Sequence, residues 1–214
     1  MITKVAIVNA LTFSRVPLIS LWFAFAVAQE YKGGVTLAFI ALFFMFLAGI
    51  SDLFDGWLAR RWRVVTSLGK MADPLMDKAF YVMTFPALTW LAAHQSENDI
   101  HAISLLLFTI LYILRDMWVT FMRSLGAMYG ADVSAMWIGK VRTALSFPTA
   151  GLVYGYISLH HSLPESWAWF GSVWLGLSYI AEFTMSILNI ASFFSYTKFY
   201  SPCIKKALAF EAKI

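Results

Sequence analysis

The chain has 214 residues, of which 60% are hydrophobic and only 13% are charged, and its formal net charge is +4. Soluble domains carry about 25% charged residues, so this composition excludes an ordinary soluble protein and indicates a membrane protein. The single cysteine, Cys203, excludes an intrachain disulfide framework and a cysteine-rich zinc site. No polar or Gly/Ser-rich stretch is long enough to be a linker, so we expect one compact all-α integral membrane domain.

Six apolar runs follow one another along the chain, separated by short segments that contain Gly, Pro, Asn, Asp or Ser. They cover about residues 11–28, 34–50, 79–93, 103–114, 144–159 and 167–194. A spanning helix needs about 20 residues, and charged flanking segments extend the second to fourth runs. The pattern predicts six transmembrane helices in a domain of residues 1–197, followed by a basic cytoplasmic tail at 198–214. No small-residue cleavage site follows the first run, so we expect its helix to be retained.

The positive charges predict the orientation. With six spans, nearly all lysines and arginines fall on one side of the membrane, and only Lys32 falls on the other. The positive-inside rule makes the basic side cytoplasmic. We therefore expect a multi-pass protein of the cytoplasmic (inner) membrane, with both termini and a polar active-site cavity on the cytoplasmic side. His94, His101, His160 and His161 then fall in outer loops, where we expect solvated side chains.

Four aspartates lie within 26 residues in a chain that is otherwise poor in charge: Asp52, Asp55, Asp73 and Asp77. The first two are three residues apart and the last two are four apart, so each pair shares one face of a helix. The basic segment between the second and third runs is short, which predicts that these two helices are antiparallel neighbours. All four carboxylates then face one space at the cytoplasmic edge of the membrane.

Carboxylates gathered at a membrane boundary repel one another and need cations or protons. An all-oxygen ligand set suits hard ions such as Mg²⁺, Mn²⁺ or Ca²⁺, and four aspartates can hold two of them. Paired divalent ions serve displacement reactions at phosphorus. The alternative is that the aspartates are solvated helix-end charges, paired with Arg60, Arg61 and Lys78.

Small residues and one arginine surround the aspartates. Gly56, Ala59 and Gly69 leave open surface where a base or ribose can approach the helices, and Arg60 offers donors to a phosphate. The whole pattern is Asp52-x2-Asp55-Gly56-x2-Ala59-Arg60-x8-Gly69-x3-Asp73-x3-Asp77. At all eight fixed positions it is similar to the signature of the CDP-alcohol phosphatidyltransferase family.

Further segments resemble the phosphatidylglycerolphosphate synthases of that family. They are "VNALTFSR" at 8–15, "DPLMDK" at 73–78, "LRDMWVTFMR" at 114–123 and "WIGKVRT" at 137–143. Together they cover about the first two-thirds of the chain. Val8 departs from this pattern because those synthases usually have proline there, and Met71, Ala72 and Met76 also replace more usual residues.

The resemblance implies a six-helix membrane enzyme, usually a homodimer, that moves a phosphatidyl group from CDP-diacylglycerol to an alcohol and releases CMP. It implies that the four aspartates bind two metal ions, Mg²⁺ or Mn²⁺, and that Asp77 is also the catalytic base. The CDP-binding residues implied are Gly56, Ala59, Arg60, Gly69, Asn9 and Thr12.

A phosphorylated acceptor needs a positive pocket of its own. The candidates on the cytoplasmic side are Arg115, Arg123, Lys140 and Arg142. Arg115 directly follows an apolar run, and charges at that depth are functional or paired; Asp116 can pair with one of these bases. The alternative is that they are snorkelling side chains or lipid-headgroup contacts. Glu182, inside the sixth run, is either a site residue or a protonated, hydrogen-bonded core residue.

The resulting hypothesis is phosphatidyl transfer to glycerol 3-phosphate, which brings a dianionic phosphate and a primary hydroxyl. The same chemistry with inositol phosphate or serine as acceptor stays open. A divalent-cation transporter is the alternative from another class, but it needs carboxylates near the bilayer midplane and a path to both faces. The expected partners are the lipid bilayer, the two substrates and a second copy of the chain, with no nucleic acid.

Overall fold

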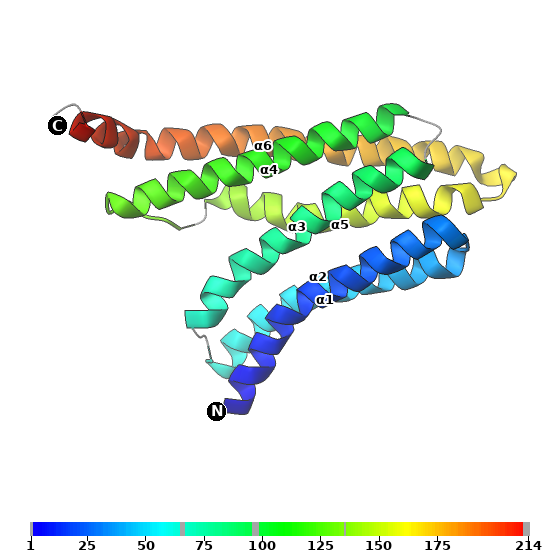
Figure 1. Cartoon of the computed structure of the whole chain (residues 1–214), viewed down its shortest axis with the longest axis horizontal. Coiled ribbons are helices and arrows are strands. Elements are labelled where there is room, and N and C mark those ends of the chain that lie inside the picture. The colour runs from blue at the N-terminus through cyan, green and yellow to red at the C-terminus, as the bar shows by residue number, and fades with distance from the viewer. Residues whose placement is uncertain (1, 65–66, 96–98, 135, 212–214) are drawn as a thin grey trace.

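A computed structural model of the chain describes residues 2–64, 67–95, 99–134 and 136–211. Over these residues the fold is all-helical (Figure 1). The six α-helices are α1 (Ile2–Lys32), α2 (Val35–Trp62), α3 (Ser67–Gln95), α4 (Asp99–Met128), α5 (Trp137–Leu159) and α6 (Ala168–Glu211). Two short 3₁₀ turns, η1 (His160–Ser162) and η2 (Glu165–Trp167), join α5 to α6. Each predicted apolar run lies almost entirely within one of these helices, so the expected all-α class is confirmed.

The helices are longer than the apolar runs because the charged segments beside those runs are helical too. α2 continues past Asp52 and Asp55 to Trp62, and α3 begins at Ser67, well before its apolar run. Inside a membrane a helix satisfies its own backbone hydrogen bonds. In α2 and α3 this helical hydrogen bonding continues through the charged segments beside the apolar runs. The acidic residues therefore lie on regular helix, and their spacing controls where they point.

Short connections end the helices. Gly33 and Gly34 have φ of 69° and 102° between α1 and α2, a backbone conformation that glycine adopts at little cost. After α4, Gly130 has φ of 71°, and the N–H of Ala131 donates to the carbonyl of Gly126 at 2.9 Å. This is the kind of bond with which a left-handed residue closes a helix end.

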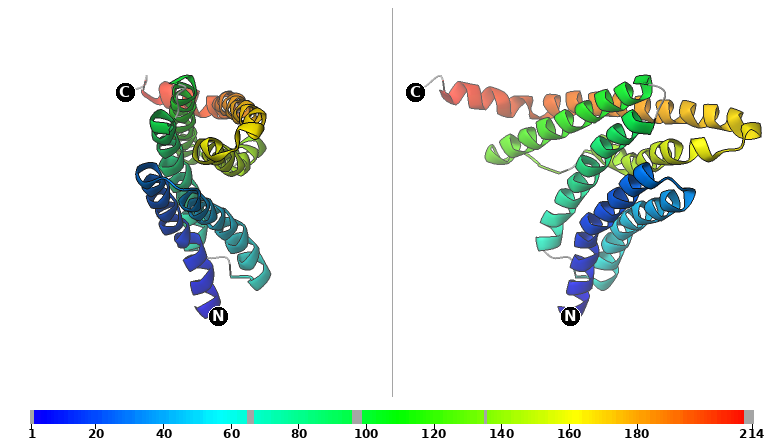
Figure 2. Two further views of the ribbon diagram at one scale, coloured as in Figure 1. Left: turned by 90° about the vertical axis from the view of Figure 1, so that its right-hand side faces the viewer. Right: turned by 45° about the vertical axis from the view of Figure 1, so that its right-hand side comes forward.

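The packing places α1 against both α2 and α3, while α3 and α5 lie in the middle of the bundle. α3 contacts α1, α4 and α5, and α5 contacts α2, α3 and α6. Figure 2 shows the α1–α2 pair leaning away from the pair formed by α4 and α6. The prediction that α2 and α3 are direct neighbours is wrong: over the described residues they make few contacts, and α1 packs on both.

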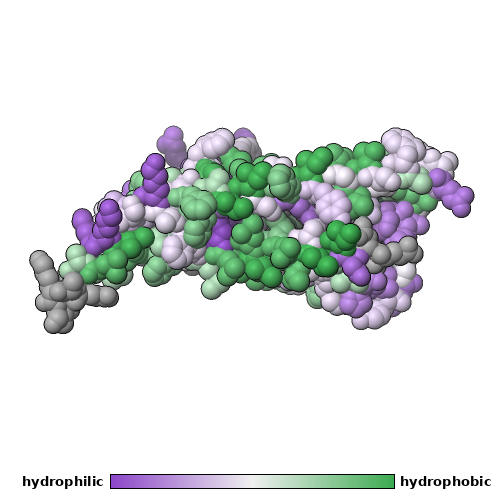
Figure 3. Space-filling model, turned by 90° about the horizontal axis from the view of Figure 1, so that it is seen from above, coloured by the Kyte–Doolittle hydropathy of each residue, from purple (hydrophilic) through white to green (hydrophobic). Residues whose placement is uncertain are grey.

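The starts of α1, α3 and α5 and the ends of α2, α4 and α6 all lie toward one end of the molecule, which we call the basic end (Figure 1). The ends of α1, α3 and α5 and the starts of α2, α4 and α6 lie toward the opposite end. On the face shown in Figure 3, hydrophobic side chains dominate the middle and hydrophilic ones gather toward both ends. Such a band of apolar surface between polar ends is the surface that a membrane protein presents.

Among the described residues, four segments are long and apolar enough to cross a membrane, and they correspond to α1, α2, α4 and α6. α3 and α5 are less apolar, but they are the two helices packed between others, with buried side chains such as Leu88 and Tyr154. A helix whose side chains contact protein needs less apolar surface than one that faces lipid. The chain is a multi-pass membrane protein.

α6 continues through the segment expected to be a tail. It has 44 residues and so is about 66 Å long at 1.5 Å per residue, more than twice the roughly 30 Å hydrocarbon core of a bilayer. Lys198, Lys205 and Lys206 therefore belong to this helix. Tyr200 and Cys203, beyond the predicted boundary at residue 197, pack with α4 in a small buried cluster.

His101 is not in an outer loop, and that prediction is wrong. It lies in the first turn of α4, fully buried, with Nε2 3.0 Å from Oε1 of Glu182 on α6. The hydroxyl of Ser104 donates to the other carboxylate oxygen of Glu182 at 2.8 Å. The rings of Tyr156 and Tyr179 lie edge-on to the imidazole, with centroids 5.6 and 5.2 Å away. Glu182 is thus a hydrogen-bonded core residue that joins α6 to α4.

Replacing Glu182 with alanine should lower the free energy of unfolding by about 1–2 kcal/mol, the upper range for interhelical hydrogen bonds in membranes. The cost arises because the buried His101 and Ser104 side chains lose their common acceptor. Thermal unfolding of Glu182→Ala, His101→Ala and the double variant in one detergent measures it. A double variant that costs the full sum of the two single effects would contradict a direct interaction.

Candidate active site

Three carboxylates from two helices converge on one arginine from a third. The Arg15 Nη2 atom on α1 lies 2.6 Å from Oδ1 of Asp52 and 3.1 Å from Oδ2 of Asp55, both on α2. Its Nη1 atom lies 2.7 Å from Oδ1 of Asp77 on α3. The hydroxyl of Thr12 lies 2.8 Å from Oδ2 of Asp55. We call Arg15, Asp52, Asp55 and Asp77 the carboxylate cluster.

Helical spacing explains how the cluster forms. Thr12 and Arg15 are three residues apart, so both face the same side of α1, and Asp52 and Asp55 share a side of α2 in the same way. The side chains of Arg15 and Asp55 are buried at 3% and 5% exposure, whereas that of Asp52 is 50% exposed. The cluster therefore has a buried side against α1 and an open side that carries Asp52 and Asp77.

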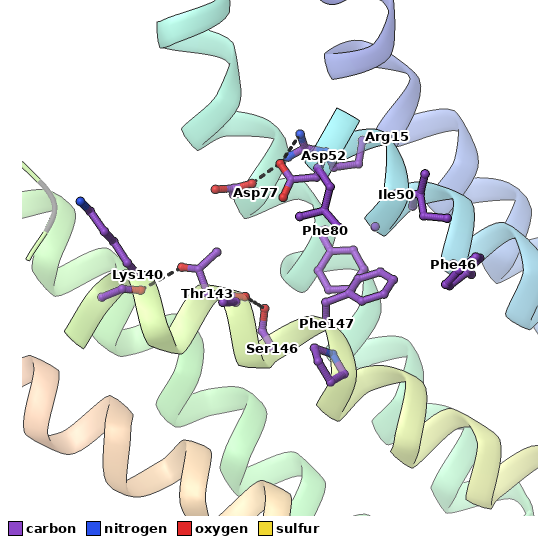
Figure 4. A pocket seen from close by; sticks show the side chains of 16 residues that line it. Arg15, Phe46, Ile50, Asp52, Asp77, Phe80, Lys140, Thr143, Ser146 and Phe147 are labelled. Carbon is purple, nitrogen blue, oxygen red and sulfur yellow. Dashed lines mark hydrogen bonds and ion pairs between the residues drawn. The ribbon is translucent and has the colours of Figure 1, made fainter. Parts of the chain in front are cut away.

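The open side borders a cavity of about 570 Å³ formed by α1, α2, α3 and α5. Figure 4 shows Arg15, Asp52 and Asp77 on one side of it, with Lys140, Thr143 and Ser146 of α5 on the facing side. The volume is within the range of about 300–1,000 Å³ that is usual for small-molecule sites.

The remaining wall of the cavity is mainly apolar. Phe80 and Phe147 lie together with ring centroids 5.3 Å apart, and Phe46 and Leu53 line the cavity beyond them. Gly49 allows α5 to come close, because a Cβ atom there would overlap the ring of Phe147. A cavity with a charged end and an apolar wall fits an amphiphilic ligand, whose polar part meets the carboxylates and whose apolar part meets the phenylalanines.

Asp73 is the one predicted metal ligand whose placement is incomplete. Its backbone lies in α3, one helical turn before Asp77, and its side chain lies outside the described part of the structure. Asp52, Asp55 and Asp77 are the predicted ligands that the structure brings together.

The predicted CDP-binding residues lie beside the cluster. Thr12 is buried and bonded to Asp55. The guanidinium of Arg60 lies over Gly56, with Nη1 3.4 Å from the position of a Cβ atom there. The other three are half-buried on α1, α2 and α3: Asn9, Ala59 and Gly69. None of the six is among the described residues that line the cavity, so their role in CDP binding stays a prediction.

Lys140 is the acceptor-phosphate candidate that the structure places on the cavity wall. Arg142 is buried behind it: its Nη2 lies 3.3 Å from Oδ1 of Asp116, and its Nη1 donates to Oδ1 of Asn189 at 2.9 Å. Arg115 is buried as well, with Nη1 3.8 Å from Oδ1 of Asp116. Both arginines therefore add positive charge behind α5 rather than on the surface of the cavity.

Arg123, the fourth candidate, is not among the described residues that line the cavity. Its Nε donates to the backbone carbonyl of Val133 in the α4–α5 connection at 2.8 Å. In the same connection the backbone N–H and the hydroxyl of Ser134 donate to Asp132, which lowers the pKa of that carboxyl. These contacts lie in the segment that precedes α5, the helix that carries Lys140.

Arg15 was not predicted from the sequence to be a site residue, although it lies in the family-like segment "VNALTFSR". A lone arginine close to the start of an apolar run was the available signal, because such a charge needs a partner. The alternative paired the aspartates with Lys78, but among the described side chains Lys78 pairs with Asp116: its Nζ lies 3.3 Å from Oδ2 of Asp116 and donates to the Thr120 hydroxyl at 2.7 Å.

The carboxylate cluster can be tested for its fit to a divalent cation. Among the described residues no three His, Cys, Asp or Glu side chains form a ready metal site, and the guanidinium of Arg15 contacts all three described carboxylates. The donors themselves are all oxygen and already converge on one cationic group at 2.6–3.1 Å. This set fits a hard ion such as Mg²⁺ or Mn²⁺ at the place that the guanidinium takes.

The fold and the site define a multi-pass helical membrane protein with a cavity whose described lining carries two aspartates, one arginine and one lysine. The family model for CDP-alcohol phosphatidyltransferase matches residues 5–192. The chain therefore belongs to the CDP-alcohol phosphatidyltransferase family and is a phosphatidyltransferase.

Curated relatives agree with the family. The CDP-diacylglycerol–glycerol-3-phosphate 3-phosphatidyltransferase of Haemophilus influenzae is 32% identical over 149 residues, which cover 68% of this chain and 74% of that protein. The enzyme of the same name from Sodalis glossinidius is 38% identical over 105 residues, 48% of this chain and 53% of its own. The cardiolipin synthase (CMP-forming) of Streptomyces coelicolor is 36% identical over 82 residues, 38% of each chain.

Proposed function

We propose that this protein transfers a phosphatidyl group from CDP-diacylglycerol to glycerol 3-phosphate and releases CMP, as a step of phospholipid biosynthesis. One observation carries the proposal: the cavity has Asp52 and Asp77 on one side and Lys140 on the other. A diphosphate held near the carboxylates by cations and an acceptor phosphate held by Lys140 can then meet in one space. The relatives named as glycerol-3-phosphate transferases support this choice of acceptor.

The reaction needs a nucleophile, a base and a place for the leaving group. The primary hydroxyl of the acceptor attacks the phosphorus that carries the diacylglycerol, a new P–O bond forms, and the bond from that phosphorus to CMP breaks. Asp77, which is about one-third exposed at the cavity, takes the hydroxyl proton as general base. CMP leaves with the bridging oxygen and both electrons of the broken bond.

The remaining acidic residues hold cations. We propose that Asp52, Asp55, Asp73 and Asp77 together bind two Mg²⁺ or Mn²⁺ ions, as the all-oxygen donor set favours. Bound divalent ions would neutralise the diphosphate and the charge that develops on the leaving CMP. Gly56, Ala59, Arg60 and Gly69, with Asn9 and Thr12, would line the CDP subsite.

The membrane placement is part of the proposal. All six helices span the bilayer, the basic end faces the cytoplasm, and the protein acts as a homodimer in the inner membrane. The gathering of lysines and arginines at the basic end, with Lys32 at the other, supports this orientation. CDP-diacylglycerol would then enter from the inner leaflet, with its acyl chains along the apolar wall of the cavity.

A second acceptor class is favoured by one specific observation, the similarity to a cardiolipin synthase. The same cavity would then take an acceptor that carries its own acyl chains, such as phosphatidylglycerol. A divalent-cation transporter is less well supported, because the matching family model and the curated relatives are phosphatidyltransferases.

A panel of acceptors tests the assignment. Purified full-length protein in lipid micelles, supplied with CDP-diacylglycerol and Mg²⁺, should release CMP with glycerol 3-phosphate. We expect much less release with serine, inositol 1-phosphate or phosphatidylglycerol. Release that requires one of these three instead would overturn the acceptor, and release with no acceptor in the panel would leave the proposal without support.

Replacing Lys140 with glutamine should raise the KM for glycerol 3-phosphate about tenfold, equivalent to ~1.4 kcal/mol of binding, with a smaller change in kcat. The reason is that Lys140 is the acceptor candidate on the cavity wall. Steady-state CMP release at varied acceptor concentration measures it, and Lys206→Gln, an exposed lysine on α6, is the control. An unchanged KM for Lys140→Gln would remove Lys140 from the acceptor site.

A further inference from the structure

Arg15 fills the space in which the carboxylates converge. It is 2% exposed, and its two terminal nitrogens reach all three described carboxylates of the cluster. Asp52 and Asp55 come from α2 and Asp77 from α3, two helices that make few direct contacts, whereas α1 packs on both. The guanidinium of α1 is therefore the group that joins the acidic side chains of α2 and α3.

A guanidinium is permanently charged, so Arg15 cannot vacate the cluster by losing its proton. A divalent ion ligated by the same carboxylates would lie within a few ångströms of the guanidinium carbon. Two like charges that close repel strongly at the effective dielectric of a protein interior. Arg15 in its observed position and a cation ligated by all three carboxylates consequently exclude each other.

The cavity offers Arg15 another position. Arg15 itself lines the cavity, so a change of side-chain rotamer can carry its guanidinium out of the cluster into the space that we assign to the diphosphate. Its Nε atom is buried and has no hydrogen-bond partner among the described residues. A buried donor of this kind costs free energy until it finds an acceptor, and a phosphate oxygen would provide one through a charge-assisted bond.

We infer that Arg15 exchanges with the divalent cation: it neutralises the carboxylate cluster before the cation binds, and it moves to phosphate oxygens in the cavity when the cation takes its place. This inference rests on the proposed metal dependence. The exchange keeps the carboxylates of the cluster neutralised at every stage, so those of α2 and α3 never face one another without a cation between them. Thr12 continues to hold Asp55 in place during the exchange.

Binding of Mn²⁺ to the purified full-length protein, followed by electron paramagnetic resonance after chelation of other ions, tests the exchange. Arg15→Gln removes the competing charge and should bind Mn²⁺ at least about tenfold more tightly than the unsubstituted protein, which equals ~1.4 kcal/mol. Arg61→Gln is the matched control: Arg61 is exposed at the same end of α2 and stacks on Trp57 at 4.8 Å, so its loss should not change the affinity. An Arg15→Gln affinity equal to or weaker than that of the unsubstituted protein would overturn the exchange.

A second variant covers the case in which Arg15→Gln does not fold without a cation. Arg15→Lys keeps the charge, but a single ammonium cannot reach three carboxylates as the guanidinium fork does. It should therefore bind Mn²⁺ with an affinity between those of the unsubstituted protein and Arg15→Gln, and should gain more in unfolding temperature from added Mn²⁺ than the unsubstituted protein does. A smaller gain and weaker binding would show that Arg15 assists cation binding instead of competing with it.

The same Mn²⁺ titration distinguishes failure of the Arg15–cation exchange from failure of the proposed metal-dependent function. If the unsubstituted protein binds Mn²⁺ and releases CMP but Arg15→Gln is no tighter, the exchange fails and the proposed function stands. If the unsubstituted protein binds no Mn²⁺ at the concentrations that support CMP release, the proposed metal dependence fails, and the exchange fails with it.

Discussion

Asp77→Asn is expected to lower the rate of CMP release at least about 10³-fold, within the 10²–10⁴-fold range of general base catalysis, while CDP-diacylglycerol binding stays measurable. Asparagine keeps the size of the side chain and can still accept a hydrogen bond from Arg15, which lies 2.7 Å from Asp77 Oδ1. It cannot take a proton from the acceptor hydroxyl at neutral pH. The loss should therefore fall mainly on kcat rather than on the KM for CDP-diacylglycerol.

The measurement for Asp77 has two parts, CMP release in the steady state and equilibrium binding of CDP-diacylglycerol to the same preparation. Asp99→Asn provides a matched control, because Asp99 is an exposed aspartate in the first turn of α4, at the end of the molecule opposite the basic end. It should turn over normally. Turnover within a few-fold of normal by Asp77→Asn would count decisively against Asp77 as the base.

Asp55→Ala is expected to abolish transfer and also to destabilise the fold by about 3 kcal/mol, the lower part of the range for breaking a buried ion pair. Asp55 is 4% exposed, and it accepts hydrogen bonds from Thr12 and from Arg15, which is itself 2% exposed. Its loss leaves part of a buried guanidinium charge uncompensated. The lower part of the range applies because Arg15 keeps its contacts with Asp52 and Asp77.

Asp52→Ala is the comparison that separates the two effects of Asp55→Ala. The Asp52 side chain is 50% exposed, so water screens its interaction with Arg15 and its loss should change stability little. Both variants should lose activity, because both remove a proposed cation ligand. Thermal unfolding in one detergent together with CMP release gives both quantities. Equal destabilisation by the two variants would contradict the distinction between a buried and an open side of the cluster.

Some features of the site follow from the sequence because they depend on spacing along one helix. Asp52 and Asp55 lie one turn apart on α2, and both reach Arg15. The six helices could be predicted for a similar reason, since long apolar runs must be helical in a membrane. The signature residues also led correctly to the family, which the comparisons confirm over residues 5–192.

Contacts between distant helices could not be derived in the same way. The helices are apolar on nearly all sides, so periodicity does not show which face of α1 meets α2 and which meets α3. A short connection suggested that α2 and α3 pack together, whereas α1 contacts both and brings Arg15 to the aspartates. His101 was misplaced because the start of α4 lay earlier than its apolar run, and its partner Glu182 is 81 residues away.

The most direct test of the account is the position of bound Mn²⁺ in crystals of the full-length protein, located by its anomalous scattering. The account predicts a peak among the carboxylates of Asp52, Asp55 and Asp77, with metal–oxygen distances a little over 2 Å as for hard octahedral ions, and the Arg15 guanidinium moved into the cavity. Anomalous peaks found only elsewhere, with Arg15 still bonded to all three carboxylates, would contradict it.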